Sequence, residues 1–71
     1  MNTGNRTKKW YKYCLDSKVL DRNGMAELRM TADEHYVIVI FKADGGIQET
    51  WSDFTTQRSD LLKMWQNWKE E

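Results

Sequence analysis

The sequence contains very few of the residues from which small proteins build cross-links or catalytic sites. Its 71 residues include one cysteine, one histidine and no proline. Because Cys14 is the only thiol, no disulfide can form within the chain, and no Cys/His group offers a structural zinc site. A chain this short buries only about 60% of the surface that its unfolded form exposes, so its stability is marginal without such reinforcement. The sequence therefore predicts one small domain that depends on its apolar core or on dimerisation.

Long apolar runs are also missing. No stretch approaches the roughly 20 apolar residues of a membrane span, and residues 1–9 are polar and basic, unlike a secretory signal peptide. Asn2 follows Met1 at the position where myristoylation requires glycine. Together with a lone thiol, these features predict a cytoplasmic protein that has no membrane partner.

The single histidine and the single cysteine limit the catalytic chemistry that the chain can perform. His35 follows Asp33 and Glu34 in a polar segment, which predicts an exposed loop histidine. These three adjacent residues lack the spacing that lets side chains converge on one metal ion. Cys14 lies in an aromatic segment, which is typical of a small core residue. Nucleophilic catalysis needs a nucleophile, a base and an orienting group, so we expect no enzyme activity, no cofactor and no metal.

What the chain has instead is a high aromatic content and an uneven distribution of charge. Four tryptophans, three tyrosines and two phenylalanines are present, and each can bury about 150–250 Å². The net charge is zero, but residues 1–30 carry seven bases against three acids, whereas residues 31–71 carry four bases against eight acids. This asymmetry suits a basic arm for nucleic acid, an acidic face for a basic partner, or an ordinary solvated surface.

The pattern of apolar residues predicts an antiparallel sheet. Residues 25–31 alternate between apolar and polar side chains, and Glu27 and Arg29 lie on the polar face. Residues 36–41 form an apolar run rich in β-branched side chains, which is typical of a central strand buried on both faces. After a glycine-containing turn, residues 47–54 are predicted to return as the next strand.

The last strand is predicted to lead into an amphipathic helix. Alternation in the strand places Ile47 and Trp51 on one face. Leu61, Trp65 and Trp68 then recur at i, i+4 and i+7, and a helix with such a stripe docks on the sheet. The predicted fold is α+β, a small antiparallel meander of three to four strands packed on one C-terminal helix.

The beginning of the chain is less regular. Residues 1–7 are predicted to be a flexible arm, and residues 8–71 to form the single β-β-β-α domain. Residues 8–20 suit either a helix or an irregular strand, and their Trp, Tyr, Cys and Val content favours extended structure.

The predicted order of three strands and a helix resembles the sheet-plus-helix arm-binding domains of tyrosine recombinases. The resemblance covers residues 26–68 and includes Phe54-Thr55 leading into the Leu/Trp stripe. It implies a sheet face that lies in the major groove of DNA. The charge departs from this pattern, because the strands and their turns carry more acids than bases, and carboxylates repel phosphates. The bases are Arg29 and Lys42, and the acids are Glu27, Asp44, Glu49 and Asp53. No residue's role is therefore transferred from that family.

One predicted helix can cover only one face of a central strand that is apolar on both faces. We expect the other face to be covered by the N-terminal aromatic segment, by another protein or by a second copy of the chain. The leading hypothesis is a small non-enzymatic interaction module, or a regulator or inhibitor, that binds another protein. Its candidate residues are Trp10, Tyr11, Tyr13 and Tyr36, since Trp and Tyr are favoured at interfaces.

The alternative hypothesis is nucleic-acid binding by the N-terminal segment, in which bases and aromatics interleave. Lysines there could hold phosphates while the rings stack on bases. The candidate residues are Arg6, Lys8, Lys9, Lys12 and Arg29. The simpler interpretation of the same segment is that its rings close the open sheet face while the lysine amines stay in water.

Overall fold

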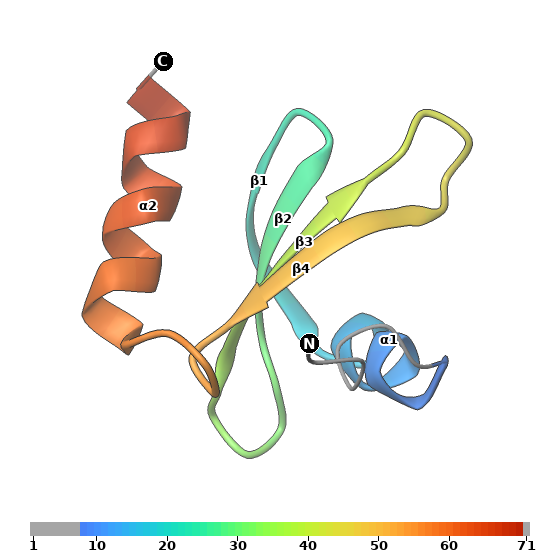
Figure 1. Cartoon of the computed structure of the whole chain (residues 1–71), viewed down its shortest axis with the longest axis horizontal. Coiled ribbons are helices and arrows are strands. Elements are labelled where there is room, and N and C mark those ends of the chain that lie inside the picture. Colours follow the sequence, from blue (N-terminus) through green and yellow to red (C-terminus); the bar gives the residue numbers. More distant parts are fainter. Residues whose placement is uncertain (1–7, 71) are drawn as a thin grey trace.

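The computed structural model describes residues 8–70, which form an α+β domain with one sheet and a helix at each end of the chain. The elements in order are α1 (Lys8–Leu15), β1 (Lys18–Asn23), β2 (Ala26–Met30), β3 (Tyr36–Phe41), β4 (Ile47–Ser52) and α2 (Arg58–Glu70). The sheet is an antiparallel meander in the order β1-β2-β3-β4 and lies between the two helices (Figure 1). The predicted class, meander and C-terminal helix are confirmed. The arm predicted at residues 1–7 lies outside the described residues.

The core has two parts, one on each face of β3. Ile38 faces α2 and packs in a cluster whose other buried members are Leu28, Leu61 and Trp65. Val37 and Val39 face α1 and pack with Cys14. All three strand residues are fully buried, which confirms the prediction of a central strand covered on both sides. Full burial of side chains of this size stabilises the fold by about 1.5–3 kcal/mol each.

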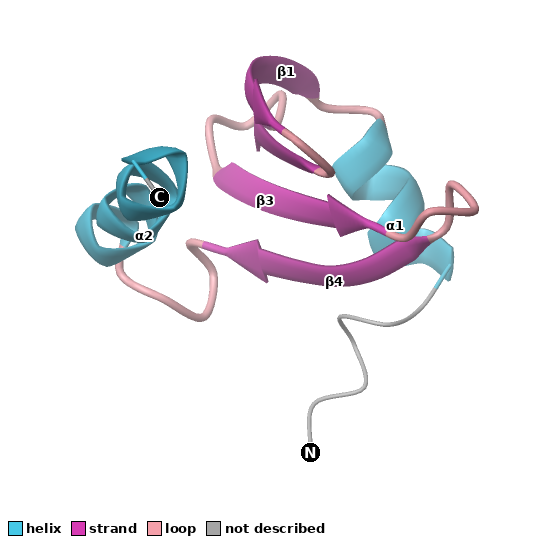
Figure 2. Ribbon diagram, turned by 90° about the horizontal axis from the view of Figure 1, so that it is seen from above, coloured by secondary structure: helices cyan, strands magenta, loops and turns pink. Residues whose placement is uncertain are grey.

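The second sheet face is covered by α1, where the sequence favoured extended structure (Figure 2). That preference is wrong for Lys8–Leu15, and strand structure begins only at Lys18. The physical reason is that helical spacing puts Trp10 and Cys14 on one face, where both pack on the sheet. This burial outweighs the β-propensity of the segment, and a helix so short would be unstable alone. The face that the recombinase resemblance assigns to a DNA groove is therefore occupied by the chain itself.

The polar face of β2 is covered by the same helix. Glu27 is buried, and its carboxylate accepts from Arg29 and Arg22, each with a nitrogen at 2.7 Å. Arg29 also donates to the carbonyl oxygens of Leu15 (3.1 Å) and Ser17 (2.8 Å), so it satisfies the C-terminal end of α1. These two charged residues join the helix to the sheet.

A register shift in β4 separates two residues that the sequence placed together. Ile40 pairs with Glu49 while Phe41 pairs with Ile47, so one extra residue enters the strand between them. Such a bulge reverses the alternation. As a result, Ile47 packs on the α1 side, whereas Trp51 pairs with Ile38 on the α2 side. The prediction that Ile47 and Trp51 share a face is wrong for this reason.

The C-terminal helix α2 is held to the sheet by its predicted stripe and by one carboxylate. Leu61 and Trp65 are buried, and Trp68 packs beside them, which confirms the stripe. Asp21 at the sheet edge accepts from Trp65 Nε1 at 3.0 Å and from Lys69 Nζ at 2.6 Å. The hydrogen bonds from Lys69 and Trp65 lower the pKa of Asp21 to about 2. Within residues 8–70, neither helix has the length and apolar character needed to cross a membrane.

Because Asp21 holds α2 to the sheet edge, we expect the stability of the fold to fall in acid. Because the pKa of Asp21 is lower in the folded chain than its usual 3.8, its ionised form stabilises the fold above that pH. The contribution is lost as the pH falls through the folded pKa of about 2. We expect the wild type to have a higher thermal midpoint than Asp21→Asn near neutral pH, and the difference to shrink during acidification. Thermal unfolding followed by circular dichroism at a series of pH values measures it. A difference that stays constant down to about pH 2 would contradict the assignment.

Candidate functional site

Four rings from three segments of the chain meet at one end of the sheet. Trp10 and Tyr13 come from α1, His35 from the loop between β2 and β3, and Phe54 from the turn after β4. The Phe54 ring centroid lies 4.1, 5.9 and 6.2 Å from those of His35, Trp10 and Tyr13. Phe54 nevertheless remains 50% exposed. These four residues are called the Phe54 surface below.

The two α1 rings of this surface are fixed by hydrogen bonds to the rest of the fold. Trp10 Nε1 donates to Thr50 Oγ1 at 2.8 Å, which ties the indole to β4. The Tyr13 hydroxyl donates to Asp33 Oδ1 at 2.8 Å, in the loop between β2 and β3. The two rings also contact each other, with centroids 5.6 Å apart. The rings are therefore held in place rather than left to sample many rotamers.

Beneath Phe54 lies a buried carboxylate that organises the two loops. The Asp53 side chain is only 4% exposed and accepts from His35 Nδ1 (2.8 Å), the Tyr36 amide (2.9 Å) and Arg58 Nε (3.1 Å). Burial acts to raise the pKa of Asp53, but hydrogen bonds from the Tyr36 amide, His35 and Arg58 hold this pKa below its usual range. An ionised Asp53 can only accept, so His35 carries its proton on Nδ1.

His35 is not the exposed loop histidine that the sequence predicted. Its side chain is 34% exposed, because one ring nitrogen binds Asp53 and the Phe54 ring packs against the imidazole. Its other nitrogen, Nε2, lies 3.9 Å from Asp33 Oδ2. Within residues 8–70, no hydroxyl or thiol hydrogen-bonds to the ring, and the His35–Asp53 contact joins the loop before β3 to the turn after β4.

Within residues 8–70, the thiol is buried and the carboxylates form no metal-binding group. Cys14 is fully buried, as predicted, and burial raises the pKa of its thiol to about 12. Such a thiol stays protonated and unreactive near neutral pH. In the part of the chain that the structure describes, no three His, Cys, Asp or Glu side chains are arranged to hold a metal ion.

The four aromatic residues predicted to bind protein lie on different parts of the fold. Trp10 and Tyr13 belong to the Phe54 surface. Tyr36 lies on the opposite sheet face, where it packs under α2 and the Arg58 guanidinium carbon lies 5.0 Å from its ring centroid. Tyr11 is half-buried on α1, and among residues 8–70 no ring contact links it to the other aromatics. The predicted set is therefore not one surface.

The basic residues predicted to bind nucleic acid also differ in their surroundings, since some are exposed and one is largely buried. Lys8, Lys9 and Lys12 are exposed on α1, and Lys12 forms an ion pair with Asp16 at 2.9 Å. Arg29 has a side chain only 12% exposed and is engaged by Glu27 and α1 carbonyls. The fifth candidate, Arg6, lies outside the described residues.

Sequence reasoning missed Phe54 and His35 as surface residues of interest. The available signal was an aromatic residue in the polar turn between a strand and a helix, where burial in the core is not expected. The sequence pattern instead places Phe54 at the end of a strand over residues 47–54, whereas β4 ends at Ser52. Its partners lie far from it in sequence, and nothing local reveals them.

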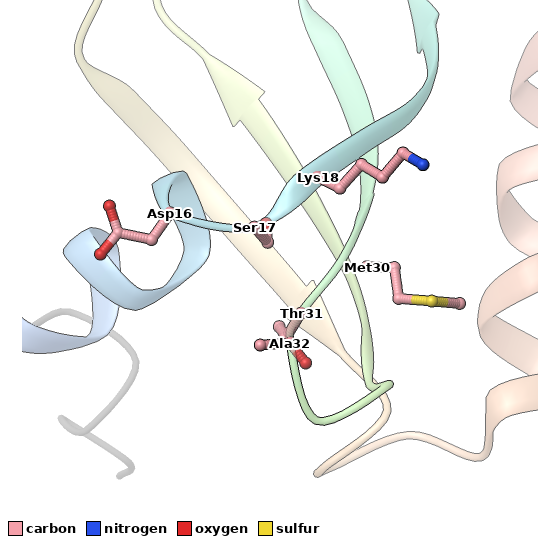
Figure 3. Close-up of a pocket in the computed structure, with 6 residues that line it drawn as sticks. All are labelled: Asp16, Ser17, Lys18, Met30, Thr31 and Ala32. Atoms are coloured by element: carbon pink, nitrogen blue, oxygen red, sulfur yellow. The ribbon is translucent and has the colours of Figure 1, made fainter.

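A shallow hollow of about 300 Å³ lies elsewhere, where α1, β1 and the end of β2 meet (Figure 3). It is lined by Asp16, Ser17, Lys18, Met30, Thr31 and Ala32. Asp16 points away from it, and Lys18 and Met30 extend toward the side of α2 (Figure 3). The Thr31 hydroxyl already donates to Asp33 and accepts from the His35 amide. Because its polar groups do not converge, this hollow is a weaker candidate than the Phe54 surface.

Comparison of the chain with protein-family models, curated proteins and solved structures finds no match.

Proposed function

We propose that this protein is a small non-enzymatic interaction module, or a regulator, that binds another protein through the Phe54 surface. The observation that carries the proposal is a phenyl ring left 50% exposed on top of three other rings. The proposed setting is the cytoplasm, where a lone thiol such as Cys14 stays reduced.

The geometry supports protein binding for two physical reasons. An exposed ring that rests on other rings offers apolar area to a partner, and aromatic residues are enriched among the residues that dominate binding energy. The rings are also fixed before binding, through the Trp10–Thr50 and Tyr13–Asp33 hydrogen bonds. A fixed surface loses little conformational entropy when a partner docks on it.

Alanine at Phe54 tests the proposal. Truncation of a dominant interface residue costs about 2 kcal/mol or more, so we expect Phe54→Ala to weaken partner binding by about 30-fold. The tagged chain would be used for affinity capture from its native cells after nuclease treatment, followed by a binding titration with the captured protein. Trp51→Ala is the matched control, because Trp51 is a partly exposed aromatic (36%) outside the surface. Equal capture by the wild type and Phe54→Ala, with both variants folded, would count against the proposal.

Nucleic-acid binding is the second candidate, supported by the exposed Lys8, Lys9 and Lys12 on α1. It is less favoured because Arg29 is engaged internally and the groups that hydrogen-bond to Tyr13 and His35 are the carboxylates of Asp33 and Asp53. Titration against single- and double-stranded DNA and RNA at several salt concentrations separates the two functions. Binding that falls steeply with salt and is lost in the triple Lys8/Lys9/Lys12→Ala variant would reverse the order of preference.

Self-association would use a different surface. Leu15, Val19 and Leu20 are exposed apolar side chains at and just before β1, which is an edge strand. Edge strands with apolar side chains are templates for pairing with another chain. Light scattering at several concentrations would give about twice the monomer mass of 8.5 kDa if the chain dimerises.

A further inference from the structure

The loops beside the Phe54 surface carry a net negative charge, whereas α1, which supplies Trp10 and Tyr13, carries three exposed lysines. His35 and Phe54 lie in residues 31–35 and 53–60, the second range including the first turn of α2. These residues contain four acids and one base. The acids are Asp33, Glu34, Asp53 and Asp60, and the base is Arg58. Arg58 is already engaged, since its Nε donates to Asp53 and one terminal nitrogen donates to the Glu34 carbonyl. Within residues 8–70, no hydrogen bond or ion pair joins Lys8 or Lys9 to these loops.

Asp33 is the carboxylate best placed to meet a partner. Its side chain is 61% exposed, in contrast to the buried Asp53. The Tyr13 and Thr31 hydroxyls both donate to its Oδ1, at 2.8 and 2.6 Å, and these hydrogen bonds hold the pKa of Asp33 below its usual range. Its Oδ2 lies 3.9 Å from the imidazole Nε2 of His35. One oxygen of this exposed carboxylate is therefore held by two hydroxyls, whereas Oδ2 accepts no side-chain hydrogen bond within residues 8–70.

An exposed ring beside an oriented carboxylate is suited to a guanidinium group. The face of an aromatic ring attracts a cation, and arginine prefers such stacking because its planar group is weakly hydrated and donates in a fixed fork. A neighbouring carboxylate adds a charge-assisted hydrogen bond. The chain already contains one such arrangement, in which Arg58 lies over Tyr36 while Nε donates to Asp53.

We propose that the partner presents an arginine-containing basic segment to the Phe54 surface, with a guanidinium over the Phe54 ring and bonded to Asp33 Oδ2. This inference rests on the proposed function and names the chemistry of the partner. A phosphate backbone would be repelled by the same carboxylates, so nucleic acid does not fit this arrangement.

The test is a titration of the ¹⁵N-labelled full chain with short synthetic peptides, followed by NMR. One peptide alternates arginine and glycine, and its matched control replaces each arginine with citrulline, which has the same shape but no charge. We expect the arginine peptide to shift the amides of Asp33, Glu34 and Phe54 at concentrations up to about 10 mM, and to bind about tenfold more tightly than the citrulline peptide.

Two variants locate the contact. Asp33→Asn keeps an oxygen for the Tyr13 and Thr31 hydroxyls but removes the charge, and Phe54→Leu keeps apolar bulk but removes the aromatic face. Each is expected to weaken arginine-peptide binding by about fivefold or more. Glu49→Gln is the matched control, since Glu49 is an exposed acid on β4 that makes no ion pair within residues 8–70, and its binding should equal that of the wild type.

The inference fails if no amide shifts, if the citrulline peptide binds equally well, or if the shifts spread over Asp44 and Glu49 as much as over Asp33. It also fails if the captured partner binds Asp33→Asn and Phe54→Leu as tightly as the wild type. In that last case a loss of binding in Phe54→Ala would still support the proposed function, so the two failures can be distinguished.

Discussion

Replacing Trp65 with alanine is expected to leave most of the protein unfolded. Trp65 is 3% exposed, packs with Leu28, Ile38 and Leu61, and contacts Trp68 edge-on with centroids 6.5 Å apart. Truncation of a buried tryptophan costs about 3–5 kcal/mol, and the core of a domain this small supplies roughly the same amount in total. The variant also loses the hydrogen bond from Trp65 Nε1 to Asp21. Urea denaturation followed by circular dichroism measures the effect.

Two further variants separate the contributions of Trp65. Trp65→Phe keeps a large buried ring and removes the hydrogen bond, so we expect it to fold with a loss of about 1–2 kcal/mol. Trp51→Ala, which removes a partly exposed ring outside both core clusters, should cost clearly less than Trp65→Ala. A cooperative Trp65→Ala protein that loses less than about 1 kcal/mol would show that α2 contributes little to the core.

Replacing Glu27 with alanine is expected to cost about 3 kcal/mol. Glu27 is the shared acceptor for Arg22 and Arg29, and the Arg29 side chain is 12% exposed beneath α1. Removing one member of a buried ion pair leaves an uncompensated charge, which typically costs 3–5 kcal/mol. We expect the lower end of this range because Arg29 keeps its hydrogen bonds to Leu15 and Ser17. Denaturant unfolding of the variant measures the loss.

A double-mutant cycle shows whether the cost comes from the pair itself. The cycle compares Glu27→Ala, Arg29→Ala and the double variant, and a coupling free energy of about 1–3 kcal/mol is expected for two charged residues in direct contact. Additive losses would contradict a shared ion pair. Glu49→Gln serves as a control, because this exposed carboxylate on β4 should change stability by less than about 0.5 kcal/mol.

Local sequence determined the parts of this fold in which a short pattern is sufficient. The apolar run of β3 indicated a strand covered on both faces, because only burial on both sides suits consecutive residues such as Val37 and Ile38. The spacing of Leu61 and Trp65 indicated a docked helix, because these positions recur on one helical face. Both predictions depend only on neighbours within a few residues.

Tertiary structure decided the remaining features, because each depends on residues that are distant in the chain. The segment from Lys8 to Leu15 is helical because Trp10 and Cys14 pack on the sheet from one face of the helix. Trp10 also donates a hydrogen bond to Thr50, which is 40 positions away in the sequence. A bulge in β4 places Ile47 on the sheet face opposite to that of Trp51. The ion pair between Glu27 and Arg29, on the polar side of β2, is buried beneath α1.

The Phe54 surface belongs to the same category. It forms only because Asp53 binds His35 across 18 positions and Tyr13 binds Asp33 across 20. Periodicity and propensity describe neighbours along the chain, whereas hydrogen bonds between loops follow from how the strands and helices pack. The sequence by itself therefore determined the central strand, the meander and the C-terminal helix, and only the packed structure brought the candidate binding residues together.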